Sequence, residues 1–342
     1  MRRFFFDRKF LKIFQYISFI FLVFVSCKQN EDQGTDISFY YWKSVFTSKE
    51  EKCLKLNECK NIYIRYFDLI KEGQIRPVAI IQFIQIPWLN VIPVVFIKNE
   101  VFNNTDSITV DSLVQNTAKL VRQINLKNKL TVNEIQFDCD WTEKTQKFYF
   151  YFLKQFGKAF PVDLSATIRL HQVKYKFKSG IPPVKRGVLM YYNMGKINSD
   201  TSNSIYDRNL ALKYLPYLKS YTLPLSVALP VFGWGIQSRD GKVIALLNKM
   251  NETDFIADTN FAEQARNIFR VKNYCFKSGF YFVKNDLVKL EFVLEKDLME
   301  MAEDLNSNLI SKPKEIIFYD LDTINLNRYN ENICKKVADN FK

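Results

Sequence analysis

The stretch that decides the fold is EIQFDCDW, residues 134–141. Its side chains at positions 135, 137 and 139 are apolar, and they alternate with polar ones at 134, 136, 138 and 140. Successive side chains of a β-strand point to opposite faces of the sheet. The stretch therefore predicts a strand whose Ile135, Phe137 and Cys139 pack under helices, while Gln136, Asp138 and Asp140 share the opposite face.

Strand-like and helix-like segments alternate on both sides of this stretch. Strands are expected at 38–46, 61–70, 78–86, 91–99, 133–141, 164–173, 187–195, 223–235 and 314–323. Helical periodicity appears at 107–125, 142–157, 207–220, 259–271 and 296–310. Strands joined through helices imply a parallel sheet. About eight such units in a chain of this length predict an α/β protein with a (β/α)8 barrel, of the TIM-barrel type.

The segment 241–295 departs from this alternation. It contains the strand-like VIALL, GFYFV and LVKLEFVL without helices between them, so it is expected to be an antiparallel insertion or a degenerate part of the barrel. We find neither an internal repeat nor a Pro- or Gly-rich linker after residue 36. Residues 37–342 are therefore expected to form a single domain.

The N-terminus has the pattern of an export signal. Residues 1–12 are basic, residues 13–25 form an apolar run, and the run stops at Ser26 and Cys27. A run of 13 residues is short for a bilayer about 30 Å thick and is typical of a secretory signal peptide. VFVSC resembles the lipobox of bacterial lipoproteins, although Phe24 is bulkier than usual at its position. We expect a signal peptide at 1–26, lipidation of Cys27 and a polar tether at 27–36. The alternative is an ordinary signal peptide followed by a chance cysteine.

Composition excludes several classes of protein. The formal charge is +13, and removal of the signal peptide, with five basic residues and one acidic residue, leaves +9. The Lys and Arg are spread along the chain without a run of five, so we expect no nucleic acid partner. The remaining cysteines are odd in number and form no CxxC pair, which argues against a disulfide framework and a zinc site; Cys53 and Cys59 could pair or stay free. A single histidine, His171, excludes multi-histidine metal sites, and we expect neither a metal nor another cofactor.

Polar and aromatic side chains gather where the predicted strands end. Active sites of such barrels lie at the carboxyl ends of the strands. The candidate catalytic residues are Asp138 and Asp140, whose pKa values we expect to be raised unless Arg65 or Arg169 compensates. The candidate ligand-binding residues are Asp68, Trp141, Arg169, His171, Tyr191, Tyr192, Asn193, Trp234 and Asp320. Carboxylates beside flat aromatic surfaces are typical of sugar-processing sites.

Two of these strands carry a family resemblance. DCDW (138–141) followed by LMYYNMG (189–195) resembles the family 18, chitinase-like glycoside hydrolases, whose DxDxE strand is followed two barrel strands later by a Met-x-Tyr-Asp strand. The chain as a whole is similar to uncharacterised barrel lipoproteins related to these enzymes. The resemblance implies that Asp138 and Asp140 orient the substrate and stabilise the intermediate, and that Tyr192 matches the family's tyrosine. Asn193 stands where the family has aspartate.

One departure from the family pattern bears directly on function. Thr142 occupies the position of the family's glutamate, and threonine cannot donate a proton to a leaving group at neutral pH. Glu143 comes one residue too late to share the face of Asp140, and Asp68, Asp320 or Asp322 could supply the acid instead. We therefore expect a monomeric, lipid-anchored protein of the bacterial cell envelope, facing the periplasm or the cell surface, whose barrel acts on a glycan. The alternatives are glycan or peptidoglycan binding without turnover, and a scaffold role.

Overall fold

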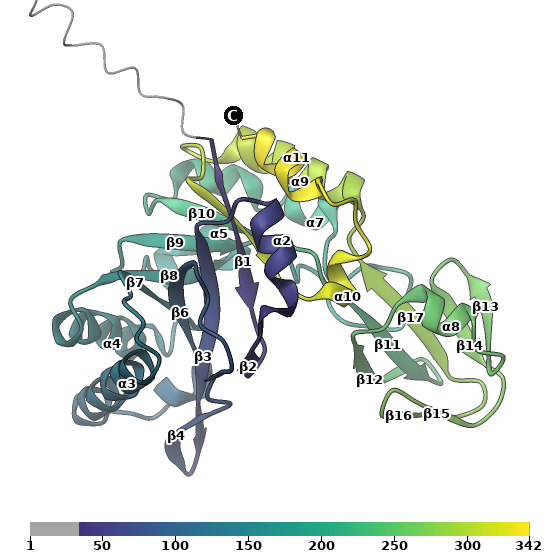
Figure 1. The fold of residues 1–342 in the computed structure, drawn as a ribbon, viewed down its shortest axis with the longest axis horizontal. Helices are drawn as coiled ribbons and strands as arrows, with labels where there is room; N and C mark the ends of the chain where they lie inside the picture. Colours follow the sequence, from purple (N-terminus) through teal and green to yellow (C-terminus); the bar gives the residue numbers. More distant parts are fainter. Residues whose placement is uncertain (1–33, 342) are drawn as a thin grey trace, which may run out of the picture. The chain divides into compact units, whose positions relative to one another are not determined.

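The structure, a computed structural model, describes residues 34–341. Eight parallel strands form a closed barrel in the order β1, β18, β10, β9, β8, β7, β6, β3, and β3 pairs with β1 to complete the ring (Figure 1). The strands are β1 (Asp36–Tyr41), β3 (Asn61–Glu72), β6 (Asn90–Ile97), β7 (Glu134–Asp138), β8 (Asp163–Arg169), β9 (Arg186–Met190), β10 (Leu225–Pro230) and β18 (Glu315–Tyr319). The predicted barrel is confirmed.

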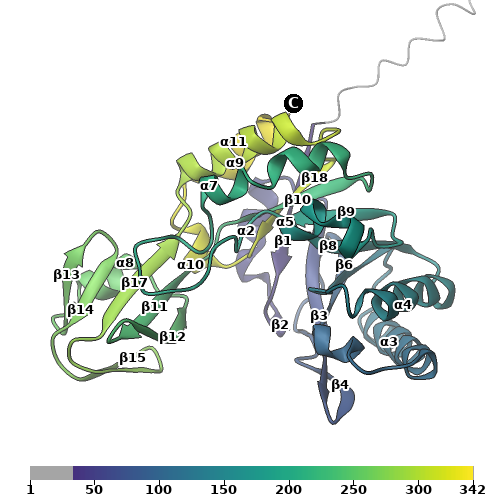
Figure 2. The ribbon, with the colours of Figure 1, turned by 180° about the vertical axis from the view of Figure 1, so that it is seen from behind.

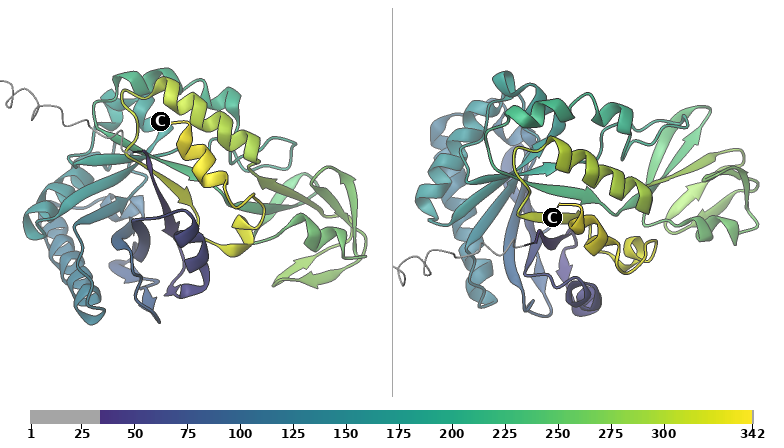
Figure 3. Two further views of the ribbon diagram at one scale, coloured as in Figure 1. Left: turned by 45° about the horizontal axis from the view of Figure 1, so that its top comes forward. Right: turned by 90° about the horizontal axis from the view of Figure 1, so that it is seen from above.

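Helices surround most of the barrel strands (Figure 3). They are η1 (Ser48–Glu50), α2 (Glu51–Leu56), η2 (Asn99–Phe102), α3 (Ser107–Lys127), α4 (Gln146–Ala159), α5 (Leu170–Lys174), α6 (Lys176–Ser179), α7 (Arg208–Ala211), η3 (Leu215–Ser220), α9 (Glu295–Asn308), α10 (Thr323–Leu326) and α11 (Ile333–Asp339). Between β3 and β6 the chain instead forms β4 (Gln74–Val78), antiparallel to β3, and β5 (Gln82–Phe83), which pairs with β2 (Val45–Phe46). The strand expected at 78–86 is thus mostly irregular, and its Ile84 and Ile86 are exposed.

An antiparallel insertion leaves the barrel after β10 and returns before α9 (Figure 2). Its elements are β11 (Gly233–Arg239), β12 (Lys242–Asn248), α8 (Glu252–Ile256), β13 (Phe261–Ala265), β14 (Ile268–Val271), β15 (Cys275–Lys277), β16 (Phe280–Phe282) and β17 (Leu287–Phe292). The expected antiparallel insertion is confirmed, and it has a small buried core of its own.

The helix expected at 259–271 is wrong. The apolar residues of this segment are spaced as in a helix, but the chain forms the hairpin of β13 and β14. Asn267 has a φ of 63°, a left-handed conformation that reverses the chain between the two strands. On β14, buried Phe269 and Val271 flank exposed Arg270, which is the alternation of a strand.

The faces of β7 follow the sequence prediction. Phe137 packs edge-on against Phe152 and Phe156 of α4, with ring centroids 5.1 and 4.8 Å apart. Gln136 points into the barrel, where its Oε1 accepts a hydrogen bond of 2.7 Å from the Tyr40 hydroxyl. The alternation of apolar and polar residues in EIQFD therefore determines which face is covered by helices.

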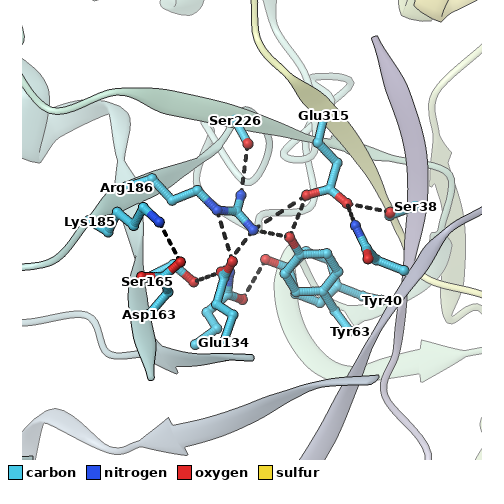
Figure 4. Close-up of polar contacts among 12 residues, drawn as sticks. Ser38, Tyr40, Tyr63, Glu134, Asp163, Ser165, Lys185, Arg186, Ser226 and Glu315 are labelled. Carbon is cyan, nitrogen blue, oxygen red and sulfur yellow. Dashed lines mark hydrogen bonds and ion pairs between the residues drawn. The ribbon is translucent and has the colours of Figure 1, made fainter. Parts of the chain in front are cut away.

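A buried polar network fills the amino end of the barrel interior (Figure 4). Arg186 of β9 forms ion pairs with Glu134 of β7 at 2.8 Å and with Glu315 of β18 at 3.4 Å. The Tyr63 hydroxyl donates to Glu315 at 2.5 Å, and Arg186 donates to Ser226 at 2.8 Å. The network links strands that are distant in sequence, and its buried charges lie beside opposite charges.

The signal peptide and Cys27 predicted above lie outside the described residues. Within residues 34–341, none of the helices has the length and apolar character needed to cross a bilayer.

Candidate functional site

A cavity of about 470 Å³ opens at the carboxyl ends of the barrel strands. Side chains at or near the ends of β6, β7, β8, β9 and β18 line it, and the insertion adds Trp234, Asn248 and Lys249. This end of the barrel is where (β/α)8 proteins place their ligand sites. The insertion therefore contributes part of the cavity wall.

Five aromatic side chains form one continuous wall of the cavity, namely Trp42, Tyr192, Phe232, Trp234 and Tyr319. Tyr192 and Tyr319 stack with ring centroids 5.5 Å apart and an interplanar angle of 22°. Trp42 meets Tyr319 edge-on at 5.6 Å, and Phe232 meets Trp234 edge-on at 5.2 Å. Because the rings support one another, their positions are set before any ligand arrives.

Asp138 is the buried carboxylate of the cavity. It is the last residue of β7, is 5% exposed, and accepts a hydrogen bond of 2.7 Å from the Thr167 hydroxyl of β8. Burial raises the pKa of Asp138 to about 6, with Arg169 opposing the rise and Asp140 adding to it. Its protonation state therefore changes close to neutral pH.

The two arginines of the cavity are each held by an aspartate. Arg65 donates to Asp68 through Nε at 2.6 Å and Nη2 at 2.5 Å. Arg169 donates to Asp140 through Nε at 2.6 Å and Nη2 at 3.2 Å. These bidentate pairs fix the guanidinium planes and neutralise much of their charge.

A second carboxylate, Asp320, follows β18 and lines the same cavity. Asn325 donates a hydrogen bond of 2.7 Å to its Oδ1. Burial raises the pKa of Asp320 to about 6, and the charge of Asp322 contributes to the rise. Asp322 itself is paired with Lys43 at 3.2 Å and with Lys249 at 3.1 Å.

The buried ion pair of Glu291 and Lys289 fixes the position of Trp234. Its indole Nε1 donates to Glu291 Oε2 at 3.0 Å, and Lys289 lies 2.7 Å from Glu291 Oε1. Lys289 also donates to the carbonyl oxygens of Asp200 and Ser202 at 2.7 and 2.8 Å. The loop after β9 and the insertion thus hold this cavity wall together.

The structure brings together most of the predicted site residues. The cavity is lined by Asp68, Asp138, Arg169, Tyr192, Asn193, Trp234 and Asp320. The structure places the other four outside the lining. Asp140 lies outside the lining and is exposed, because β7 ends at Asp138. It reaches the site only through its ion pair with Arg169. His171 lies on α5, also outside the lining; its side chain is exposed by accessible area, and partial desolvation of the ring by its neighbours lowers its pKa.

Trp141 and Tyr191 are packing residues. Trp141 is buried under α4, stacks on Tyr149 at 5.3 Å, and donates to the Ser179 carbonyl at 2.7 Å. Tyr191 is fully buried on the opposite face of the chain from Tyr192, where its ring lies 6.3 Å from that of Tyr206. Because side chains of extended chain alternate, only one of two adjacent tyrosines can face the cavity.

The position of the family's glutamate is outside the cavity. Thr142 and Glu143 are exposed, and the Thr142 backbone N–H donates to Thr145 Oγ1 at 2.9 Å in the turn that precedes α4. Neither residue lines the cavity.

Several lining residues were not predicted from the sequence, among them Lys43, Phe96, Met190, Phe232, Asn248, Lys249, Tyr319 and Asn325. Tyr319 carried a usable signal, since it directly precedes Asp320 at a strand end. Trp42, which follows β1, was not among the predicted site residues either. No sequence motif indicated Asn248 and Lys249. They belong to the antiparallel insertion, whose position relative to the barrel strands cannot be predicted from the alternation of strands and helices.

The described part of the chain holds no group of three His, Cys, Asp or Glu side chains arranged to bind a metal ion.

Comparison with known proteins rests on structure alone. No family model and no curated protein matches the sequence. The spore cortex-lytic enzyme SleL of Bacillus megaterium QM B1551 superposes with a TM-score of 0.56 at 14% identity, covering 92% of this chain and 76% of its own. SleL of Bacillus cereus superposes with a TM-score of 0.53 at 13% identity, covering 90% of this chain and 74% of its own. A GH18 chitinase from Cycas revoluta, solved with (GlcNAc)4, superposes with a TM-score of 0.52 at 10% identity, covering 90% of this chain and 100% of its own. The chain therefore has a chitinase-like (β/α)8 barrel.

Proposed function

We propose that this protein binds a glycan in the aromatic-walled cavity, and that it does so in the bacterial cell envelope as a monomer anchored through a lipid on Cys27. The observation that carries the proposal is the wall of Trp42, Tyr192, Phe232, Trp234 and Tyr319 beside the carboxylates Asp138 and Asp320. Sugar rings stack their apolar faces on aromatic rings, while their hydroxyl groups donate to carboxylates.

The electrostatics favour a neutral, polar ligand. Arg65 and Arg169 are paired with Asp68 and Asp140, and Lys249 is paired with Asp322. An anionic ligand would have to compete with these carboxylates for the cations. A neutral glycan can instead form hydrogen bonds with the pairs while leaving them intact.

The similar solved structures support the class of ligand. The Cycas revoluta chitinase was solved with (GlcNAc)4, and the two SleL proteins are named as spore cortex-lytic enzymes. Oligosaccharides of N-acetylglucosamine and peptidoglycan fragments are therefore the first ligands to test.

Binding without hydrolysis is the form of the proposal that the geometry supports best. A family 18 enzyme takes its proton donor from the residue that is Thr142 here, and Thr142 is exposed outside the cavity. Asp140, the second aspartate of the motif, is also outside the lining and is held by Arg169.

Hydrolysis is a second candidate, and one specific observation favours it. Asp138 and Asp320 line the same cavity from strands on different sides of the barrel, and burial raises the pKa of each to about 6. A carboxyl group with a pKa in this range can donate a proton near neutral pH. In this version one of the two acids protonates the leaving oxygen and the other assists as the carboxylate.

Titration calorimetry of the full chain with (GlcNAc)4 and with peptidoglycan fragments tests the binding proposal. We expect Trp234→Ala and Trp42→Ala each to weaken the affinity at least about tenfold, since each removes a stacking surface. Trp88→Ala is the matched control, because Trp88 is 54% exposed and lines a different pocket. If no glycan binds, or if all three variants bind alike, the proposal is wrong.

Release of reducing ends in the same samples separates the two candidates. Binding alone predicts no release at any pH. Hydrolysis predicts release that Asp138→Asn and Asp320→Asn each abolish while glycan binding survives.

A further inference from the structure

A second surface, distant in the sequence from most of the cavity residues, combines lysines with exposed apolar side chains. It is formed by α5 and α6, which connect β8 to β9, and by α7 and η3, which connect β9 to β10. We call it the basic aromatic surface. Its lysines are Lys174, Lys176, Lys178, Lys213 and Lys219.

Specific contacts join the two halves of this surface. Lys176 donates to the Ser220 carbonyl oxygen, and Lys174 donates to the Lys213 carbonyl oxygen at 3.4 Å. The Lys174 ammonium also lies 5.2 Å from the ring centre of Tyr214 and 5.3 Å from that of Tyr217. The lysines of 174–178 and of 213–219 therefore share one surface, although about 40 residues separate them in the sequence.

Acidic residues are scarce in the segments that form this surface. The sequence contains no Asp or Glu between Asp163 and Asp200, and none between Asp207 and Asp240. The nearby carboxylates of α9, Glu300 and Asp304, are paired with Arg208. Among residues 34–341, the ion pairs involve none of the five lysines.

Large apolar side chains project from between the lysines. Phe177 is 94% exposed, Tyr175 52%, Leu212 49% and Tyr217 41%. Exposed apolar side chains that are grouped on one surface mark an interaction site. Lysines interleaved with aromatic residues are typical of protein surfaces that lie in the interface of an anionic membrane.

We infer that the basic aromatic surface docks onto an anionic phospholipid bilayer. The lysines are complementary to the phosphate headgroups, and Phe177 enters the boundary between headgroups and acyl chains. A soluble polyanion matches the lysines but offers no apolar phase for a side chain that is 94% exposed. The inference is independent of glycan binding and of the lipid expected at Cys27.

A local probe at Phe177 tests the inference in residues 28–342, which keep the whole described barrel and lack both the basic, apolar segment 1–26 and Cys27. Phe177→Trp places an indole at an exposed position where the fold tolerates it. With vesicles of phosphatidylglycerol and phosphatidylcholine, we expect this indole emission to shift to shorter wavelength and to be quenched by brominated lipid, relative to the same chain without Phe177→Trp. With pure phosphatidylcholine vesicles we expect neither change. Binding to the anionic vesicles without quenching at position 177 would show that another part of the chain inserts, and the inference would be wrong.

A charge variant and a matched control test the lysines. Replacing Lys174, Lys176, Lys178, Lys213 and Lys219 with glutamine should lower partitioning onto the anionic vesicles about 100-fold, since each lysine near an anionic surface adds to binding. The control replaces Lys119, Lys242, Lys272, Lys284 and Lys296, which are exposed elsewhere, and should change partitioning far less. Equal losses in both variants would indicate net charge alone and would overturn the inference. So would equally tight binding of heparin or double-stranded DNA, which would indicate a polyanion site.

Discussion

Asp138 lies at the end of β7, and burial raises its pKa to about 6. In the unfolded chain an aspartate has a pKa of about 3.9. The folded state therefore binds this proton more tightly, so the contribution of Asp138 to stability is present below about pH 4 and is lost as the pH rises through about 6. At neutral pH the charged form of Asp138 destabilises the fold.

We therefore predict that Asp138→Asn is more stable than the unaltered chain at pH 7.5, by up to about 3 kcal/mol. The asparagine stays neutral and can still accept the hydrogen bond from Thr167. The gain should shrink toward zero at pH 4, as measured by urea unfolding at both pH values. Asp140→Asn is the control, because it removes the partner of Arg169 and should give no gain. A loss of stability in Asp138→Asn that is larger at pH 7.5 than at pH 4 would contradict the argument.

Glu291 accepts the hydrogen bond that positions the Trp234 indole, and two variants isolate this role. Glu291→Gln and Glu291→Met both remove the ion pair with Lys289, but only glutamine retains an oxygen that accepts from the Trp234 indole. We predict that Glu291→Gln, which keeps a hydrogen bond to the indole, binds glycan within about twofold of the affinity of the unaltered chain. In Glu291→Met, which loses this hydrogen bond, the affinity should fall up to about tenfold. Titration calorimetry measures both. If the two variants bind equally, the hydrogen bond does not position the ring.

At the scale of the secondary-structure elements, Arg186 links β9 to β7 and β18 in the amino half of the barrel (Figure 4). Arg186→Met leaves the buried Glu315 and the partly buried Glu134 without their cation, and removing one partner of a buried pair costs about 3–5 kcal/mol. We predict a loss of this size in urea unfolding. The triple variant that adds Glu134→Gln and Glu315→Gln should recover most of it, because no unpaired charge is then buried. A triple variant as unstable as Arg186→Met would show that packing, and not charge, sets the cost.

The sequence predicted the barrel because its strands and helices differ in periodicity. EIQFD alternates, whereas the helix Ser107–Lys127 repeats its apolar residues every three or four positions and was predicted nearly to its ends. The segment 259–271 shows the limit of this argument, because its apolar spacing fits a helix and the turn at Asn267 leaves only a weak local signal.

Part of the candidate site could also be predicted from the pattern of strands and helices. Strand-end residues such as Asp138, Arg169, Tyr192 and Asp320 could be placed at the mouth from topology alone. The direction of the chain beyond a strand end depends on contacts that no local pattern encodes. Trp141 therefore turned under α4 and Asp140 turned outward, and Trp234 faces the cavity only because the insertion folds back beside it.

At the scale of the whole molecule, charge that looks scattered in the sequence is concentrated by the fold. Residues 144–222 contain 14 Lys and Arg against three Asp and no Glu. A search for runs of basic residues could not find this, because the lysines of 174–178 and 213–219 meet only in the folded barrel. The cavity, by contrast, pairs its cations with aspartates. One molecule thus presents a neutral polar cavity and a separate basic aromatic surface.

The proposed attachment through Cys27 also belongs to the scale of the whole molecule, because it would decide where the barrel works. Lipidation forms a bond to the thiol sulfur, so Cys27→Ala should reduce incorporation of labelled fatty acid in cells to background. Cys53→Ala is the matched control, since Cys53 lies in α2 of the folded barrel and its removal should leave labelling unchanged.

The basic aromatic surface predicts a further result. When cells make residues 28–342 alone, the protein should sediment with membranes at low salt after lysis and be released at about 0.5 M salt, where charge interactions at the membrane surface are screened within about 4–5 Å. Fatty acid incorporation into Cys27→Ala would contradict the lipobox assignment, whereas sedimentation that resists salt would show that neither Cys27 nor the lysines account for the attachment.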